Sequence, residues 1–267
     1  MNIDTQSLLI WQKFNCYNFV ESSHQYFYYD RPVKYSVTQY ISKFFPEFNQ
    51  DEISDKYAKK HKMSQEDVLA DWKRKADISA ISGTIIHSWL ENAKRGKTFD
   101  IDYSLAVKAN VAEEVRDRVN ILLPKAKAFH KETLGKLYPI QLEYTVGIED
   151  KIAGNIDMLC WNDYAQEFQI WDYKNTKEIS RIGFQNARCL PPFNDYQDCN
   201  FVHYSIQQNV YKAIIQRELS IAIGKCFLVH FDYTKHDDSF KVFECANYQN
   251  IINKELDSLV SKSCGVS

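Results

Sequence analysis

The chain has 267 residues, of which 45% are hydrophobic and 25% charged, and its formal net charge at pH 7 is −2. This composition excludes a disordered chain, and the small net charge excludes a uniformly basic nucleic-acid-binding protein, so any basic surface has to be local. No apolar run reaches the roughly 20 residues needed to cross a bilayer. We therefore expect a soluble, intracellular protein without membrane contact.

The seven cysteines are scattered, and none forms a C-x-x-C pair. Residues 1–14 also lack the basic segment and apolar run of a secretory signal. Together these features predict reduced thiols inside a cell. A four-cysteine zinc or iron–sulfur site, formed by cysteines distant in sequence, stays open as a less favoured alternative.

The N-terminal part begins with alternating aromatic and polar residues over 17–45. This alternation predicts a small pair of strands leading into Ser36-Val37-Thr38. A short helix is predicted over residues 38–46, ending near Pro46.

Helical patterning then dominates residues 64–94, opened by Ser64 at the capping position. Gly83 interrupts the pattern. It either divides the segment into two helices or allows another group to approach the backbone closely. A further long helix is predicted over residues 103–135, with a bend at Pro124.

The second half of the chain has a different pattern, with three consecutive strands, a helix, two strands and a final helix. These are expected over residues 139–148, 152–161, 166–174, 203–219, 225–233, 239–245 and 247–262. The order favours an α/β fold with a mixed central sheet flanked by helices. It does not show the strict β-α-β alternation of a dinucleotide-binding fold. We predict a single domain, divided into an N-terminal strand and helical elaboration (1–80), a core (81–246) and a C-terminal helix (247–267).

Two acidic residues lie within apolar, aromatic strands: Asp157 in Gly154-Asn155-Ile156-Asp157, and Asp172 in Asp172-Tyr173-Lys174. The polar turn Asn162-Asp163 between them predicts a hairpin, which can bring the two carboxylates together. Carboxylates held close repel each other unless a cation lies between them. Lys174 points to the same face of its strand as Asp172. The pattern indicates a site for an oxygen-preferring divalent metal such as Mg²⁺.

Two further pairs are spaced four residues apart on predicted helices: His87 with Glu91, and Gln207 with Tyr211. Such pairs share a helical face, but either one alone also fits an ordinary hydrogen-bonded or amphipathic position. A glutamine amide can orient water or a phosphate oxygen, and a tyrosine can stack on a base. Spacing by itself leaves their roles open.

Taken in chain order, these motifs resemble the PD-(D/E)XK nuclease superfamily, and within it the RecB-like exonuclease branch. That branch includes phage nucleases, CRISPR-associated nucleases and the mitochondrial genome maintenance exonuclease. The resemblance covers about residues 35–235 and rests on Tyr35-Ser36-Val37-Thr38, Gly83-x-x-x-His87, Glu143, Gly154-x-x-Asp157, Asp172-x-Lys174 and Gln207-x-x-x-Tyr211. Ile156 stands where the superfamily's name has proline, and Asp172 where many members have Glu; both departures are common in the RecB-like branch.

The resemblance implies an αβββαβ core and metal-dependent cleavage of DNA phosphodiesters. It makes His87, Asp157 and Asp172 metal ligands, with Lys174 orienting the attacking water and stabilising charge on the phosphate. Glu143 matches a less constant acidic position, so a metal ligand and an ordinary strand-end acid both remain open for it.

The backbone carbonyl of Tyr173 is a further candidate ligand, and carboxylate oxygens suit Mg²⁺ or Mn²⁺. The nitrogen of His87 shifts the preference towards Mn²⁺. Lys174, beside two carboxylates and a phosphate, should stay protonated, which favours charge stabilisation over a general-base role.

DNA contacts are expected near the site and on a basic run before His87. Gln207 and Tyr211 match the family's element beside the nucleic acid, and the hydroxyls of Ser36 and Thr38 are expected to donate to phosphates. The basic run, which includes Lys73 and Arg74, supplies positive charge, although interspersed acids also fit a solvated helix face.

We therefore expect an Mg²⁺- or Mn²⁺-dependent DNA exonuclease acting on single-stranded or end-containing DNA. Replication or recombination proteins are the expected partners. Two alternatives remain open: an endonuclease of the same superfamily, and an inactive DNA-binding protein on the same fold.

Overall fold

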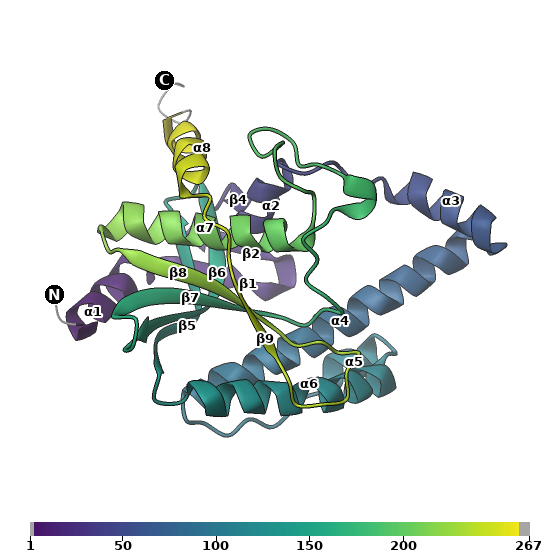
Figure 1. The fold of residues 1–267 in the computed structure, drawn as a ribbon, viewed down its shortest axis with the longest axis horizontal. Helices are drawn as coiled ribbons and strands as arrows, with labels where there is room; N and C mark the ends of the chain where they lie inside the picture. Colours follow the sequence, from purple (N-terminus) through teal and green to yellow (C-terminus); the bar gives the residue numbers. More distant parts are fainter. Residues whose placement is uncertain (1–2, 262–267) are drawn as a thin grey trace.

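The computed structural model describes residues 3–261, and its centre is a mixed sheet with helices on both faces (Figure 1). In this described part six strands form the sheet, in the order β4-β6-β7-β8-β9, with β5 also paired to β6. They are β4 (Tyr35–Ser36), β5 (Leu137–Ile148), β6 (Ile152–Asn162), β7 (Glu167–Lys174), β8 (Ile223–His230) and β9 (Lys241–Glu244). The predicted fold class is confirmed.

The helices around this sheet follow the expected order. β5, β6 and β7 form an antiparallel meander, and α7 then crosses to β8, which lies parallel to β7. The helices are α4 (Gln65–Lys94), α5 (Ser104–Lys108), α6 (Ala112–Thr133), α7 (Asn200–Leu219) and α8 (Gln249–Ser261). Residue 262, the end of the last predicted helix, lies outside the described residues.

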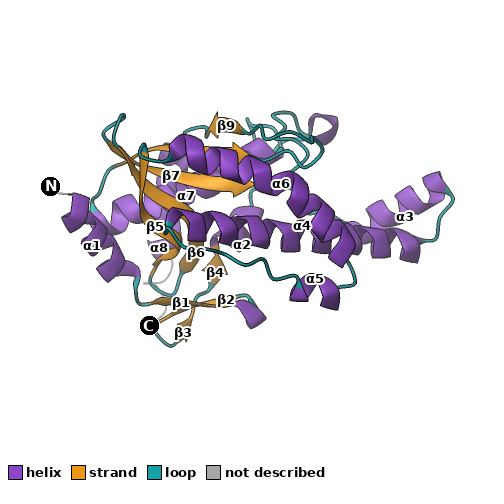
Figure 2. Ribbon diagram, turned by 90° about the horizontal axis from the view of Figure 1, so that it is seen from below, coloured by secondary structure: helices purple, strands orange, loops and turns teal. Residues whose placement is uncertain are grey.

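The N-terminal part contains more helix than its sequence indicated. The predicted strands and short helix are present, but the first helix and the helix after Asn49 were not predicted. The elements are α1 (Ile3–Phe14), β1 (Tyr17–Val20), the 3₁₀ turn η1 (Glu21–Ser23), β2 (Gln25–Tyr28), β3 (Arg31–Pro32), α2 (Val37–Ser42) and α3 (Gln50–His61). Figures 1 and 2 show α3 and the first half of α4 projecting from the body as a pair. None of the described helices has both the length and the apolar character that crossing a bilayer requires.

Each face of the sheet has its own apolar core. Helices α1, α2, α7 and α8 cover one face, and α4, α5 and α6 cover the other. Strand β7 shows the division, because Phe168 and Ile170 pack under α7 while Trp171 and Tyr173 pack under α4 and α6. This is the period of two that a strand buried on both sides requires.

The alternation breaks in β6 at Asp157. Ile156 packs in the core under α7, whereas Met158, only two residues on, packs in the core under α4. In β5 the same switch occurs across Glu143, whose φ of +46° is left-handed. Residues two apart in a regular strand share a face, so Glu143 and Asp157 mark one irregular level that crosses both strands.

Strand β6 also changes partners at this level. Its Ile152 and Ala153 pair with β4, and its residues 158–162 pair with β7, while β5 runs along β6 from end to end. Because a strand has two edges, β4 and β7 must share the edge opposite β5. The segment Gly154–Asp157 lies between them without a registered partner on that edge, and this opening in the sheet positions the candidate site.

Helix α4 runs continuously through Gly83, so the predicted division into two helices is wrong. Ser64 caps its start by accepting a hydrogen bond from the Asp67 N–H at 3.0 Å. Glycine costs about 1 kcal/mol inside a helix, and the packing of buried Ile78 and Ile86 on either side outweighs that cost. The predicted helix over 103–135 is instead two helices, separated at Asn110 with φ +55°, and α6 continues through Pro124.

No neighbouring group among the described residues packs tightly against the backbone of Gly83. A Cβ built there would meet only Asn175 Nδ2, at the ordinary contact distance of 3.7 Å. Gly83→Ala should therefore stabilise the fold by about 0.5–1 kcal/mol, a rise in Tm of roughly 1–4 °C. Gly96→Ala is the matched control: with φ +67° at the end of the same helix, it should lower Tm. A lower Tm for Gly83→Ala would show that the glycine is structurally required.

Candidate metal centre

Three side chains from three different elements converge at the opening in the sheet. His87 comes from α4, Glu143 from β5 and Asp157 from β6, and one ligand atom from each lies within 4.8 Å of the others. The Nδ1 atom of His87 lies 3.5 Å from Glu143 Oε1 and 3.4 Å from Asp157 Oδ2. All three side chains are mostly buried. The predicted His87–Asp157 pair is thus brought together, and Glu143 joins it.

The backbone of Tyr173 orients two members of this cluster. Its N–H donates to Asp157 Oδ2 at 2.8 Å, and its carbonyl oxygen lies 3.0 Å from His87 Nε2. A ligating histidine commonly donates its second ring N–H to such a carbonyl, which fixes the ring and leaves the other nitrogen for the metal. We had expected the Tyr173 carbonyl to bind the metal itself. In the structure this carbonyl instead holds His87 with Nδ1 directed at the carboxylates.

The geometry fits a hard divalent cation. With metal–ligand bonds of 2.0–2.1 Å, neighbouring ligands of an octahedral ion lie about 3 Å apart, and the His87–carboxylate distances are only slightly wider. Glu143 Oε1 is buried without a hydrogen-bond donor among the described residues. A buried acceptor without a donor is costly, and a cation would satisfy it. The donor set of one nitrogen and carboxylate oxygens suits Mn²⁺ or Mg²⁺.

The charges of the cluster are strongly coupled. Burial alone lowers the pKa of His87, but the carboxylates of Asp157 and Glu143 outweigh it and raise that pKa to about 9. Burial also raises the pKa of Asp157; His87 opposes this shift and Glu143 adds to it. The imidazolium is therefore the cation that holds these two acids together when nothing else does.

Asp172 and Lys174 form a second charged pair beside the cluster. Lys174 Nζ lies 2.6 Å from Asp172 Oδ2, and Asp172 is only 4% exposed. Burial raises the pKa of Asp172 to about 6 despite Lys174. The pKa of Lys174, which burial lowers, is raised to about 12 by Asp172 and Asp157.

The predicted ligand set is therefore rearranged in the structure. Glu143, the least certain candidate, belongs to the compact cluster, whereas Asp172 lies against Lys174 and is not one of its three members. The two groups still interact, since Asp157 contributes to the raised pKa values of both Asp172 and Lys174.

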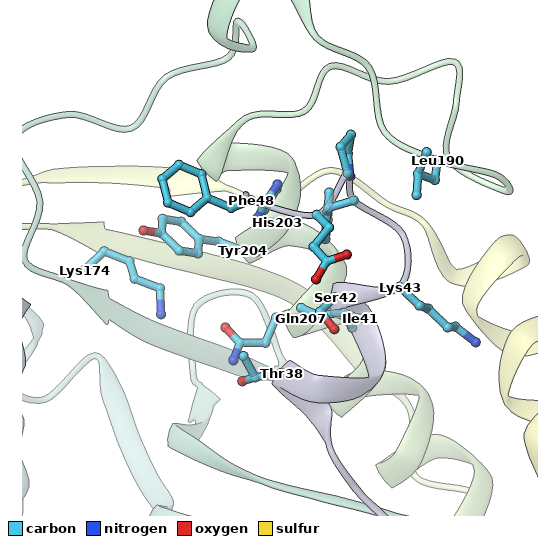
Figure 3. Close-up of a pocket in the computed structure, with 13 residues that line it drawn as sticks. Thr38, Ile41, Ser42, Lys43, Phe48, Lys174, Leu190, His203, Tyr204 and Gln207 are labelled. Atoms are coloured by element: carbon cyan, nitrogen blue, oxygen red, sulfur yellow. The ribbon is translucent and has the colours of Figure 1, made fainter. Parts of the chain in front are cut away.

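Two clefts meet at Lys174. One, of about 500 Å³, lies over the metal cluster and the α4 face that includes Gly83 and Thr84. The other, of about 790 Å³, lies between α2, the segment after it and α7 (Figure 3). Lys174 lines both clefts.

Of the pair Gln207 and Tyr211, the first lies at the surface of a cleft and the second is buried in the core. Gln207 lines the larger cleft and donates to the Tyr211 hydroxyl at 3.3 Å. Tyr211 is only 4% exposed, so it does not offer a face to nucleic acid as we had expected. Its ring instead packs on Gly154, where an added Cβ would lie 2.9 Å from the ring and from Val37. Gly154 is therefore required by packing.

The two residues whose hydroxyls were expected to bind phosphate, Ser36 and Thr38, differ in their surroundings. Thr38 lines the larger cleft with Gln207 and Lys174. Ser36 caps α2, with its hydroxyl accepting from the Gln39 N–H at 3.1 Å, and it pairs in the sheet with Ala153.

The basic run on α4 does not reach this region. Arg74 lies 13 residues before His87, about 20 Å along the helix. Lys73 pairs with Asp77 at 2.6 Å, and Arg74 pairs with Glu114. These cations are matched within the chain, as in a solvated helix face.

Several cleft residues were not identified from the sequence. Asn175 lines the metal cleft with a buried Oδ1 that has no donor among the described residues. Phe48, His203 and Tyr204 line the larger cleft. Asn175 could have been identified from its position directly after Lys174, whereas the spacing of the aromatic residues gave no indication of a cleft. No cysteine belongs to a metal-type cluster in the described part of the chain.

Comparisons with known proteins leave the family of this chain open. No family model matches the sequence, and no curated protein matches it. Among solved structures the chain is similar to the crystal structure of SSO0001, at 16% identity and a TM-score of 0.28, over 66% of this chain and 74% of that chain. A likeness this distant supports no argument, so fold and site define only a mixed α/β protein with a candidate metal triad.

Metal binding should be visible as thermal stabilisation. An ion at about 100 times its Kd stabilises a fold by about 2.7 kcal/mol, which corresponds to a rise in Tm of roughly 5–10 °C here. We expect Mn²⁺ to produce this rise, Asp157→Asn to abolish it, and the exposed-site control Asp257→Asn to retain it. An unchanged Tm of the unaltered protein across a Mn²⁺ titration would exclude the ion site.

Proposed function

We propose that this protein is a metal-dependent DNA phosphodiesterase of the PD-(D/E)XK type, most similar to the RecB-like exonucleases. The observation that carries the proposal is the convergence of His87, Glu143 and Asp157 at an opening in the sheet, directly beside the buried Asp172–Lys174 pair. This combines a cation site, a fixed ammonium and an open cleft. The ordered motifs of the sequence support the same reading.

The residues have separable roles in phosphodiester hydrolysis. A divalent ion held by His87, Glu143 and Asp157 would lower the pKa of a bound water and neutralise charge on a phosphate oxygen. Lys174 stays protonated, because its pKa is raised to about 12, so it acts as a fixed positive charge next to the phosphate. Asp172 holds that ammonium in place at 2.6 Å.

Thr38 and Gln207 extend this surface away from the reacting group. Both line the larger cleft together with Lys174. A hydroxyl and an amide can bind phosphate oxygens or orient water without adding charge. Since the chain as a whole is not basic, these local contacts are what hold the substrate. DNA with a single-stranded region or a free end is the substrate we propose.

Digestion of end-labelled DNA tests the proposal. We expect Mg²⁺ or Mn²⁺ to support cleavage, with single-stranded DNA degraded faster than duplex, and EDTA or Asp157→Asn to abolish it. Resistance of circular single-stranded DNA would identify an exonuclease, and its cutting an endonuclease of the same superfamily. Binding without cleavage in either metal would identify an inactive DNA-binding protein, and cleavage that survives chelation would overturn the metal mechanism.

Lys174→Met separates chemistry from binding, since it keeps the length of the side chain and removes its charge. We expect cleavage to fall about 100- to 1,000-fold, the usual cost of losing one preorganised electrostatic contact, while DNA binding in EDTA stays within a few-fold. The matched control is Lys225→Met, at an exposed lysine that pairs with Glu244 at 2.7 Å. Thermal unfolding of both variants checks the fold, and undiminished cleavage by folded Lys174→Met would remove this residue from the mechanism.

A further inference from the structure

The larger cleft, of about 790 Å³, has walls unlike those of the metal cleft. Most of its lining surface is apolar or aromatic; among its polar side chains, Thr38, Tyr204 and Gln207 lie towards Lys174, whereas Lys43 lies on the far side (Figure 3). Pockets of roughly 300–1,000 Å³ with this combination suit a small, flat, largely apolar group that carries hydrogen-bonding edges. A nucleobase has that chemistry.

One wall is a preformed aromatic stack. The rings of Phe45 and His203 are stacked, with centroids 3.4 Å apart and an angle of 26° between the planes. His203 is held by Asp198, which lies 2.6 Å from its Nε2. Phe48 lines the same cleft and is 63% exposed. An exposed aromatic side chain beside a rigid stack offers a face on which a base can stack.

Three of the polar side chains lie at the end of the cleft that Lys174 lines. Tyr204 lies with its ring 4.7 Å from Lys174 Nζ, and Gln207 and Thr38 lie on the same side of the cleft in Figure 3. The Gln207 amide is oriented by Tyr211, so its hydrogen-bonding groups are fixed before a ligand arrives. A side-chain amide can pair with the edge of a base.

Charge distinguishes a base from a second phosphate as the occupant. Lys174 and Lys43 stand on opposite sides of the cleft in the view of Figure 3. Glu47 also lines the cleft. A carboxylate repels phosphate but accepts hydrogen bonds from exocyclic amino groups. Since Lys43 pairs with Glu255 at 3.0 Å and Lys174 with Asp172 at 2.6 Å, neither lysine is an unmatched cation for a second phosphate, and an uncharged base suits the cleft better.

We propose that this cleft binds one unpaired nucleobase of the DNA strand, next to the phosphodiester held at Lys174 and the metal triad. The inference rests on the proposed function and adds a substrate feature to it. A base in a duplex is stacked and paired, and it has to leave the helix before it can enter such a pocket. Single-stranded DNA meets no such barrier, so the cleft accounts for a preference for unpaired DNA.

The test is an abasic scan of binding in EDTA, where no metal-dependent cleavage occurs. A short single-stranded oligonucleotide is prepared with an abasic site at each position in turn, and affinities are measured by fluorescence anisotropy. We expect one position to dominate, with a loss of about 5- to 150-fold, the range that stacking of one base supplies. Phe48→Ala should weaken binding of the intact oligonucleotide and remove the difference at that position, whereas Phe48→Tyr should keep it.

Tyr164→Ala is the control, at an 80% exposed tyrosine in the β6–β7 turn, the end of these strands away from Asp157 and Asp172. It should leave the profile unchanged. A scan with no dominant position, or one that is the same in Phe48→Ala, would overturn the pocket even if the protein cleaves DNA. Failure to bind or cleave any DNA would instead overturn the proposed function, and the pocket with it.

Discussion

Three acids buried at one level of the sheet are the constraint on which the rest of the site depends. Among the described residues, the cationic side chains that face Glu143, Asp157 and Asp172 are His87 and Lys174. Buried carboxylates are tolerated only where cations and donors compensate them. Oε1 of Glu143 nevertheless lacks a hydrogen-bond donor among the described residues, and the pKa of His87 is raised to about 9. The site thus contains more acidic than cationic side chains, and a bound divalent cation would balance this excess of negative charge.

The same constraint explains which parts of the molecule could be predicted from sequence. The meander β5–β7 and helix α7 follow from apolar runs that are buried on both sides, so local pattern was enough. Helix α3 was missed because it buries only Ser54 and Ala58 and has no apolar stripe to read. The motif acids were recognised, but the exchange of places between Glu143 and Asp172 was not. That exchange depends on a left-handed residue in β5 and a phase change in β6, and both are properties of the assembled sheet.

Lys174 links the two clefts because of its place in the alternation of β7. Trp171 and Tyr173 belong to the core under α4, whereas Phe168 and Ile170 belong to the core under α7. Asp172 and Lys174 alternate with Trp171 and Tyr173 along the strand, so their side chains point to the other face, towards α7. The backbone of Tyr173 meanwhile contacts His87 on the α4 side. One short strand therefore orients two members of the metal cluster through its backbone on one face and supplies the fixed ammonium on the other. A substrate strand that spans both clefts has to pass this point, where the proposed chemistry and the proposed base pocket adjoin.

The site carries energetic disadvantages that a bound cation would offset. A left-handed glutamate within a strand costs about 1–3 kcal/mol, and replacement of buried ion pairs by apolar residues is often neutral or stabilising. Without a bound cation, the fold would therefore lose little stability if Glu143 or Asp172 were replaced by apolar residues. Acids beside a phosphate site become useful when a metal ion is held between them. A left-handed Glu143, a carboxylate oxygen without a donor and the Asp172–Lys174 pair lie together in one place, and a bound divalent ion would stabilise this arrangement, as the proposed function requires.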